Sequence, residues 1–231
     1  MEETRDDRTR LLLGDAGLTA LKNAHVTVVG VGGVGGHCTE ALARAGVGRM
    51  CLIDADVVAP SNLNRQLFAT KSTLGMPKAE AAKLRLSEVS ETEVTTVKVF
   101  LTPENIGEYI PQETDCIADC CDSVPAKVAL ALYGKEHGIP VVAALGAGNR
   151  LDPSAFRVTD IFETSGCPLA RKLRYELRKA GVKRLDVVVS DEEPKKGKPG
   201  DPVGSIATVP GASGLVLASR VIALLTAQTK Q

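Results

Sequence analysis

Short apolar runs alternate with stretches of helical periodicity through the first two-thirds of the chain. Runs rich in β-branched and other apolar residues predict buried strands at 25–29, 50–53, 94–100, 116–118 and 141–144. The segments between them favour helices from about Val34 to Ala45, from Pro77 to Val89, and from Ser123, as N-cap, to about His137. This alternation predicts an α/β fold: a doubly wound, mostly parallel sheet with helices on both faces.

The last third of the chain has a different pattern. Strands are predicted at 156–161 and 185–190, on either side of a helix over 168–180. A polar loop at 191–202 comes next, then a short strand over 206–209 and an apolar helix over 214–225. A chain of 231 residues is long enough for one large core. We therefore expect a single domain, 1–231, with a C-terminal α/β extension.

A glycine-rich turn follows the first predicted strand and contains Gly30, Gly32, Gly33 and Gly35. The G-x-G-x-x-G spacing permits a tight turn, close approach of a pyrophosphate and close packing of helix on strand. A helix that opens near Val34 directs free amides and its positive dipole end at such a phosphate. Asp54 ends the next strand, where a carboxylate usually meets a ribose hydroxyl. The pattern predicts a nucleotide site of Rossmann-like type.

Two nucleotide chemistries fit this turn. A nicotinamide dehydrogenase would use the same glycines but would not need cations for a triphosphate. Arg65 and Lys78 follow the second strand and are suited to neutralising phosphate oxygens, although either could be a surface cation. Asp122 follows the fourth strand, at the edge where such sheets bind ligands, and is suited to Mg²⁺. The alternative for Asp122 is a helix N-cap beside Ser123.

Composition narrows the class of protein. Lys and Arg number 28 against 28 Asp and Glu, and 44% of residues are hydrophobic, as in soluble globular proteins. The charged N-terminus does not resemble a signal peptide, and the apolar stretch 214–227 is shorter than a membrane span and contains Arg220. The six cysteines have no framework spacing. We expect a cytoplasmic protein with reduced thiols and no membrane partner.

Five motifs, in this order, resemble those of the ThiF/MoeB family of adenylating proteins, which are related to ubiquitin-activating enzymes. The motifs are Gly30–Gly35, Asp54–Asp56, Ser61–Gln66, Gly75–Lys78 and Asp119–Ser123. The resemblance covers about residues 5–150 as an ATP-binding core, leaving 151–231 as a substrate-binding extension. It implies an ATP-dependent adenylyltransferase that works as a homodimer.

The resemblance also implies roles for individual residues. Asp54 would hold the ribose and Asp122 would serve Mg²⁺, while Arg8 matches an arginine that reaches ATP from the partner subunit. The phosphate and nucleotide contacts would come from Asp56, Ser61, Asn62, Arg65, Gln66 and Lys78. Transfer of AMP turns a carboxylate into an acyl adenylate, whose AMP leaves readily. Arg65, Lys78 and the metal would stabilise the charge that develops, so Arg65, Lys78 and Asp122 are the predicted catalytic residues.

The branch of the family depends on the last third of the chain. Activators of ubiquitin-like sulfur carriers generally have two Cys-x-x-Cys pairs, which are absent, so no structural zinc is expected. Asp152-Pro153, Val158–Asp160 and Pro168–Arg174 instead resemble the tRNA threonylcarbamoyladenosine dehydratases. Those enzymes use ATP to activate the carboxylate of this modified adenosine, next to the anticodon, and cyclise it. The alternatives are activation of a carrier's C-terminal glycine, a non-enzymatic nucleotide-binding module and a dehydrogenase.

Two further features bear on partners and chemistry. Arg171, Arg174 and Arg178 share one face of the predicted helix and are suited to tRNA phosphates, the alternative being a solvated amphipathic helix. Cys167 directly precedes that helix and is a candidate nucleophile, the alternative being a loop or capping residue. Ala212 stands where some dehydratases have a cysteine, so an obligatory thioester is not expected. The resemblance also allows for cysteine desulfurase or sulfur-acceptor partners.

Overall fold

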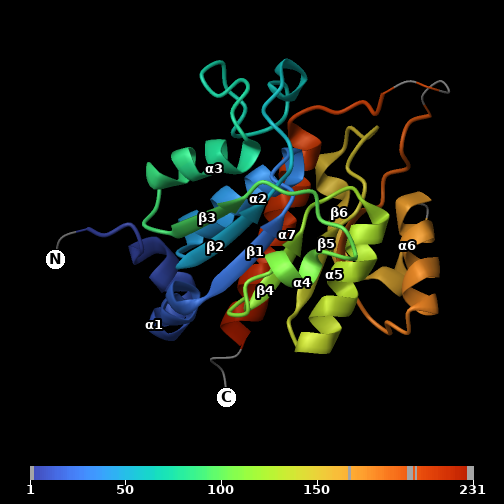
Figure 1. Cartoon of the computed structure of the whole chain (residues 1–231). Coiled ribbons are helices and arrows are strands. Elements are labelled where there is room, and N and C mark those ends of the chain that lie inside the picture. The colour runs from blue at the N-terminus through green and yellow to red at the C-terminus, as the bar shows by residue number, and fades with distance from the viewer. Residues whose placement is uncertain (1–2, 166–167, 197–199, 201, 228–231) are drawn as a thin grey trace.

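A computed structural model describes residues 3–165, 168–196, 200 and 202–227. Seven strands form one sheet in the order β3-β2-β1-β4-β5-β7-β6, and β6, antiparallel to β7, is the exception in an otherwise parallel sheet (Figure 1). The strands are β1 (His25–Val29), β2 (Arg49–Ile53), β3 (Glu93–Val97), β4 (Cys116–Asp119), β5 (Val141–Ala144), β6 (Phe156–Asp160) and β7 (Asp186–Ser190). The doubly wound α/β fold predicted from the sequence is confirmed.

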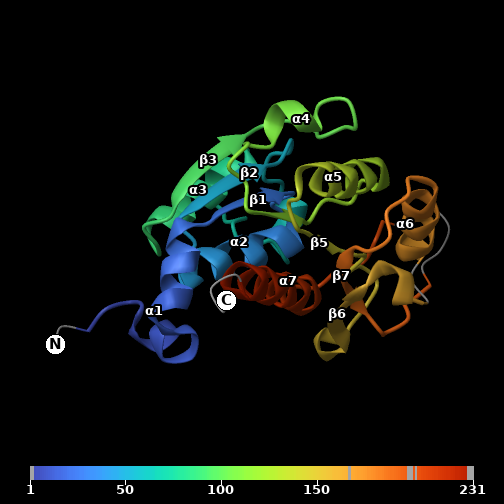
Figure 2. The same ribbon diagram turned by 90° about the horizontal axis from the view of Figure 1, so that it is seen from below.

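Helices cover both faces of this sheet. The helices are α1 (Asp7–Asn23), α2 (Gly33–Ala45), α3 (Lys78–Ser87), α4 (Ile106–Tyr109), α5 (Val124–His137), α6 (Pro168–Lys179) and α7 (Thr208–Ala227). Single 3-10 turns lie at η1 (Pro60–Asn62), η2 (Pro153–Ala155) and η3 (Ile161–Glu163). Figure 2 shows α2 and α7 below the sheet and α4 and α5 above it.

Side-chain alternation along the strands builds two layers of core. In β5, Val142 and Ala144 face the cluster formed with α1, α2, α3 and α7, whereas Ala143 faces the cluster formed with α5 and α6. Residues of β1 and β2 that face the same way as Ala143 pack with α4 and α5 in a third cluster. Strands buried on both faces read as continuous apolar runs, which is why the sequence pattern identified them.

The chain reverses its direction of progress across the sheet between β1 and β4. From β1 the chain moves outward through β2 to β3, and then returns to place β4 on the other side of β1. The loops that leave the carboxyl ends of β1 and β4 therefore diverge and open a crevice, where ligands of such sheets bind. This switch point positions the candidate site.

Several helix boundaries follow the predicted signals. The Ser123 hydroxyl accepts a hydrogen bond from the amide of Ala126 at the start of α5, which ends at Gly138 with a φ of +69°. Gly46 ends α2 in the left-handed conformation, with a φ of +100°. The predicted N-cap Ser123 is thus confirmed, and both helices end at a glycine in the left-handed conformation.

The region before the last helix corrects the sequence prediction. The strand predicted over 206–209 is wrong, because α7 begins at Thr208 and continues to Ala227, beyond the predicted 214–225. Pro210 lies in the first turn of α7, where amides have no intrahelical partner and proline costs little. Of the β-branched residues that suggested a strand, Val209 is a buried residue of α7, Thr208 is exposed at its start, and Ile206 is exposed before it.

The same helix is the one element of the described residues long and apolar enough, by length and composition, to cross a membrane. Half of that window is buried inside the protein. α7 packs along α2, and its Arg220 donates to Asp186 of β7 at 2.7 Å. These contacts are those of a core helix.

The N-terminal helix was not predicted. α1 runs from Asp7 to Asn23 and bends at Gly14, whose φ of +69° is not helical. Its buried residues are Gly17 and Leu21, so the apolar face is too narrow to give a clear helical period.

Candidate functional site

A cavity of about 460 Å³ lies at the carboxyl ends of the central strands. Its walls come from the loops after β1, β2, β3, β4 and β5, and from the segment that leads into α7. The predicted site residues that line it are Gly30, Gly32, Gly33, Asp54, Asp56, Asn62, Arg65, Gln66, Lys78 and Asp122. Positions separated by more than 90 residues in sequence are therefore brought to one cavity.

The glycine turn brings the start of α2 close to β1. Gly30 has a φ of +86°, and a Cβ there would lie 3.0 Å from the backbone of Cys120. A Cβ at Gly35 would lie 1.8 Å from the Gly30 carbonyl oxygen, which no rearrangement of side chains relieves. Since α2 has no side-chain cap at Gly32, its first amides are free to bind an anion in the cavity.

Asp54 braces this turn. Its carboxylate accepts the amide of Val31 at 2.6 Å through one oxygen and the amide of Asp56 at 2.9 Å through the other. Each carboxylate oxygen has a second acceptor site, so both can still bind hydroxyl groups from the cavity. Asp54 is therefore suited to a ribose while it fixes the loop that approaches the phosphates.

Lys78 is held at the cavity wall by Asp56. Its ammonium group lies 2.7 Å from the Asp56 carboxylate, and its amide donates to the Asp56 carbonyl at 3.0 Å. Lys78 is 8% exposed, whereas the Asp56 side chain is 69% exposed. The pair keeps a cation at the cavity, with a carboxylate that can turn towards solvent when an anion arrives.

The loop after β2 contributes the second cation. Arg65 donates to the Ser61 carbonyl at 2.8 Å and to the Asn64 side chain at 2.9 Å, both through one guanidinium nitrogen. The Asn62 side chain accepts the amide of Ala59 at 3.0 Å, which closes the 3-10 turn. Ser61 is exposed and is not among the residues that line the cavity.

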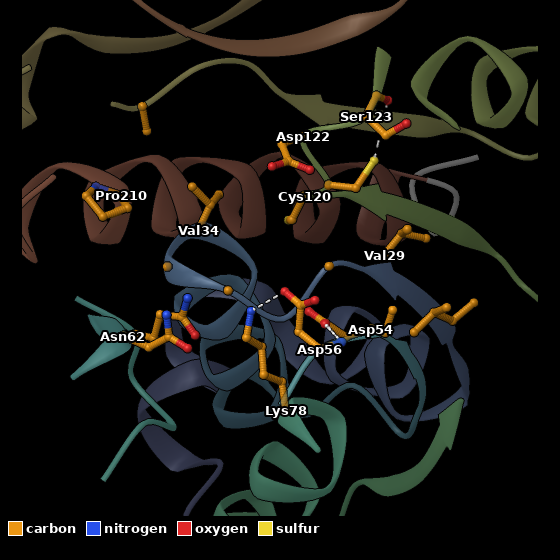
Figure 3. Close-up of a pocket in the computed structure, with 18 of the residues that line it drawn as sticks. Val29, Val34, Asp54, Asp56, Asn62, Lys78, Cys120, Asp122, Ser123 and Pro210 are labelled. Carbon is orange, nitrogen blue, oxygen red and sulfur yellow. Dashed lines mark hydrogen bonds and ion pairs between the residues drawn. The ribbon is translucent and has the colours of Figure 1, made fainter. Parts of the chain in front are cut away.

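Asp122 and Ser123 lie on the opposite side of the cavity from Lys78, Asp56 and Asn62 (Figure 3). Ser123 caps α5, so the alternative assignment of Asp122 as the cap is not what the structure has. Asp122 is exposed and faces the cavity. Lys78 therefore faces the cavity from the side of Asp54 and Asp56, and Asp122 faces it from the other side. A cation for phosphate oxygens and a carboxylate for Mg²⁺ in one cavity suit a metal-bound polyphosphate.

A buried ion pair, missed from the sequence, supports the turn that carries Asp122. Asp119 and Lys127 are 3.0 Å apart, and both side chains are fully buried. Burial is the largest influence on Lys127 and opposes its charge, but the Asp119 carboxylate, together with Cys121 and Cys120, leaves the Lys127 pKa raised. The same Asp119 oxygen accepts from the amide and thiol of Cys121, and burial raises the pKa of that thiol above its usual range.

Other cavity residues carry no motif. Val99, Phe100 and Leu101 follow β3, which ends at Val97, so part of the predicted strand 94–100 is an apolar wall of the cavity. At the end of the cavity away from residues 99–101, the lining residues are Ala147, Gly148, Val203, Ser205 and Pro210. A wall made of apolar and backbone groups leaves no spacing by which the sequence could identify it.

The arginines of α6 lie outside the cavity, on a helix that packs through Leu173 and Leu177. Arg174 is partly buried and donates to the carbonyl and hydroxyl of Thr164. Arg178 stacks over Phe162, 5.3 Å from the ring centroid. Arg171 is exposed. The three arginines predicted for tRNA are therefore not one free row, because two have partners within the protein.

Two predicted residues lie elsewhere. Arg8 is exposed on α1 and does not line the cavity of its own chain. Cys167 lies outside the described residues. The cysteines at 38, 51, 116, 120 and 121 are free thiols.

Known proteins of one family are similar to this chain in sequence and in structure. A model of the ThiF family matches residues 7–231. The tRNA threonylcarbamoyladenosine dehydratase of Bacillus subtilis is 38% identical, over 93% of this chain and 92% of that protein. A crystal structure of the Escherichia coli tRNA N6-threonylcarbamoyladenosine dehydratase with AMP superposes with a TM-score of 0.90 and 34% identity, over 98% of both chains. The same E. coli enzyme with ATP gives a TM-score of 0.90 at 36% identity, over 97% of this chain and 94% of that one.

Proposed function

The chain belongs to the ThiF family, and we propose that it is an ATP-dependent tRNA threonylcarbamoyladenosine dehydratase. The observation that carries the proposal is the cavity itself. The uncapped start of α2, the cations Arg65 and Lys78, and the carboxylates Asp54, Asp56 and Asp122 line one cavity at the switch point of the sheet. Two relatives of this name match nearly the whole chain, and one of them, the E. coli enzyme, has structures with AMP and with ATP bound; these matches support the substrate and the nucleotide.

We place ATP along the carboxyl edge of the sheet. Asp54 would accept the ribose hydroxyls, and the apolar wall 99–101 would cover the base, because both lie at the β2–β3 end of the cavity. The amides at the start of α2 would bind phosphate oxygens, with Lys78 and Arg65 beside them. This order follows from the strand order.

The chemistry proposed is activation of a carboxylate. One carboxylate oxygen of the modified nucleoside forms a bond to the α-phosphorus of ATP, and the bond from that phosphorus to pyrophosphate breaks. A nucleophile of the same modification then attacks the acyl carbon, and AMP leaves with that oxygen. Lys78 and Arg65 hold the phosphates in place and offset the negative charge that develops. Because the second step is intramolecular, the protein needs no nucleophile of its own for it.

Mg²⁺ belongs to the proposal as the partner of ATP. Asp122 supplies the hard oxygen ligand that Mg²⁺ prefers. No group of three or more His, Cys, Asp or Glu side chains suited to a metal occurs in the part of the chain that the structure describes. An ion there would depend on phosphate oxygens as well as Asp122, as in other nucleotide sites, where it neutralises phosphate charge.

A homodimer is proposed on the exposure of α1. Leu11 and Leu12 are 83% and 86% exposed, which is unusual for adjacent leucines on a helix. Arg8 is exposed one turn away on the same helix and is not among the residues that line the cavity of its own chain. Pairing through this helix would cover the leucines and carry Arg8 towards the partner's cavity.

For tRNA contact, we propose Arg171 rather than the whole predicted row. Arg171 is exposed and paired with nothing in the described residues, whereas Arg174 and Arg178 are engaged by Thr164 and Phe162. A single phosphate contact adds to the affinity for tRNA but carries no sequence information.

The test is incubation of the protein with ATP, Mg²⁺ and tRNA bearing the modification, followed by mass spectrometry of the nucleosides. We expect the mass of the nucleoside to fall by that of one water. We also expect one molecule of AMP to form for each nucleoside converted. Unchanged nucleoside with folded, ATP-binding protein would overturn the proposal. Pyrophosphate exchange that depends on a ubiquitin-like carrier would favour the carrier activator instead.

A further inference from the structure

The segment Pro202–Ile206 crosses the end of the cavity that lies farthest from Asp54, and it is held there by specific bonds. We propose that this segment, the substrate strap, forms the binding wall for the modified nucleoside, and that Asn149 is the positioning residue that holds it. The inference rests on the proposed function, since it assigns the substrate end of the same cavity.

Asn149 is bonded to the strap on two sides. Its amide donates to the Gly204 carbonyl at 2.7 Å, and its side-chain oxygen accepts the Gly204 amide at 2.7 Å. Asn149 has a φ of +58°, the single positive value among the described residues other than glycine. That backbone conformation costs free energy for most side chains and is best tolerated by Asn and Asp. The strain is evidence that the bonded geometry, rather than local preference, fixes this residue.

Two further contacts seat the strap. The side chain of Asn64 donates to the Ser205 carbonyl at 2.9 Å, which joins the strap to the loop that carries Arg65. Val203 lies directly on Gly148: a Cβ at Gly148 would be 2.1 Å from a Val203 methyl carbon. Gly148, Val203 and Ser205 all line the cavity, and Val203 is 72% exposed although it is apolar. An apolar side chain that lines a cavity and is open to solvent is suited to cover a ligand.

The strand order places the strap beyond the phosphates. Asp54 follows β2 and Gly148 follows β5, and these strands are separated by β1 and β4. Three strand spacings of about 4.8 Å make roughly 14 Å, which exceeds the span of a ribose with one phosphate. With the adenosine at Asp54 and the phosphates at the start of α2, the α-phosphorus faces the β4–β5 end. The carboxylate that attacks it must therefore enter beside the strap.

The proposal predicts that the affinity for tRNA and the affinity for ATP respond differently to loss of Asn149. Loss of the strap's seat should weaken binding of the tRNA substrate and leave ATP binding unchanged, because Asn149 does not line the cavity and contacts no predicted nucleotide ligand. A purely structural role would lower stability or both affinities together. Asn64 is a poorer probe, since its side chain also accepts from Arg65.

The experiment compares four forms of the full chain: wild type, Asn149→Asp, Asn149→Gly and Asn149→Val. Asp keeps the acceptor and tolerates the positive φ; Gly tolerates the φ but loses the acceptor; Val loses the acceptor and is strained. For Asn149→Val we expect the KM for modified tRNA to rise about tenfold, with Asn149→Gly intermediate and Asn149→Asp near wild type. The Kd for a non-hydrolysable ATP analogue should stay within about twofold in all four.

A second pair of variants tests the seat independently. Gly148→Ala should raise the KM for tRNA, because its new methyl group collides with Val203. In Gly148→Ala/Val203→Ala the nearest strap atoms would be 3.5 and 3.6 Å away, an ordinary contact. The double variant should therefore return to the KM of Val203→Ala alone.

The outcomes separate the inference from the function on which it rests. If the wild-type protein makes no cyclic nucleoside, the proposed function fails. If the wild type is active and the KM for tRNA is the same in Asn149→Val as in Asn149→Asp, the strap assignment is overturned. A parallel loss of ATP affinity in Asn149→Val would also overturn it, because the strap would then belong to the nucleotide side.

Discussion

The buried pair of Asp119 and Lys127 makes a quantitative prediction about stability. Lys127 is fully buried, and Asp119 is its ion-pair partner at 3.0 Å. The perturbation is Lys127→Met, which keeps the length of the side chain and removes its charge. Asp119 is then left as an uncompensated buried carboxylate, and one of its oxygens already has no hydrogen-bond partner in the described structure.

The expected cost follows from that burial. Removing one partner of a buried ion pair typically costs about 3–5 kcal/mol, because the remaining charge stays out of water. A domain of ordinary stability unfolds with about 5–15 kcal/mol, so Lys127→Met should remain folded with a much lower midpoint in urea. The double variant Asp119→Asn/Lys127→Met removes both charges and should recover at least about 2 kcal/mol of the loss.

The assay is urea unfolding of wild type, both single variants and the double variant, followed by far-ultraviolet circular dichroism at one pH. AMP formation by folded Lys127→Met should also fall, because Lys127 holds Asp119 in place. Asp119 in turn accepts the amide of Cys121 and so fixes the turn that carries Asp122. A Lys127→Met protein within about 1 kcal/mol of wild type, with no recovery in the double variant, would refute the reasoning.

The remaining predictions concern the chemistry. Lys78→Ala, Arg65→Ala and Asp122→Ala should each lower the rate of AMP formation by about 100-fold or more without unfolding the protein, since each removes a group from the phosphates. Lys83→Ala, an exposed position on the same helix as Lys78, is the matched control; wild-type turnover in any of the three would refute that residue's role. Chelation of Mg²⁺ with EDTA should abolish AMP formation and be reversed by added Mg²⁺, whereas activity in EDTA would exclude the metal. Cys167→Ser should retain part of the activity, and complete loss with intact ATP binding would establish the thiol as essential.

The sequence predicted the glycine turn, the start of α5 and the central strands well, because the physical constraints on these elements are local. The glycine turn needs Gly30 for a positive φ and Gly35 for contact with the Gly30 carbonyl, and both needs leave a fixed spacing. The N-cap Ser123 is likewise a local signal, which marks the start of α5. Strands buried on both faces are continuous apolar runs, so the central sheet was also predictable.

The rest of the site depends on contacts that no local pattern records. The strap reaches Asn149 across 55 residues, through the side chain and amide of Asn149 and the amide and carbonyl of Gly204. The helical period at 168–180 gave a row of arginines, but the partner of Arg174 is Thr164, which only the folded chain brings beside it. The strand predicted over 206–209 failed because packing against α2 decides that segment, not β propensity.

The fate of a carboxylate oxygen tests the central claim most directly. Modified tRNA labelled with ¹⁸O in the carboxylate of its threonyl group would be converted with unlabelled ATP, and the nucleotide products analysed by mass spectrometry. Adenylation predicts one labelled oxygen in AMP and none in pyrophosphate, because the oxygen that attacks the α-phosphorus leaves with it. Label in inorganic phosphate with ADP as co-product, or unlabelled AMP beside cyclic nucleoside, would contradict activation by adenylation.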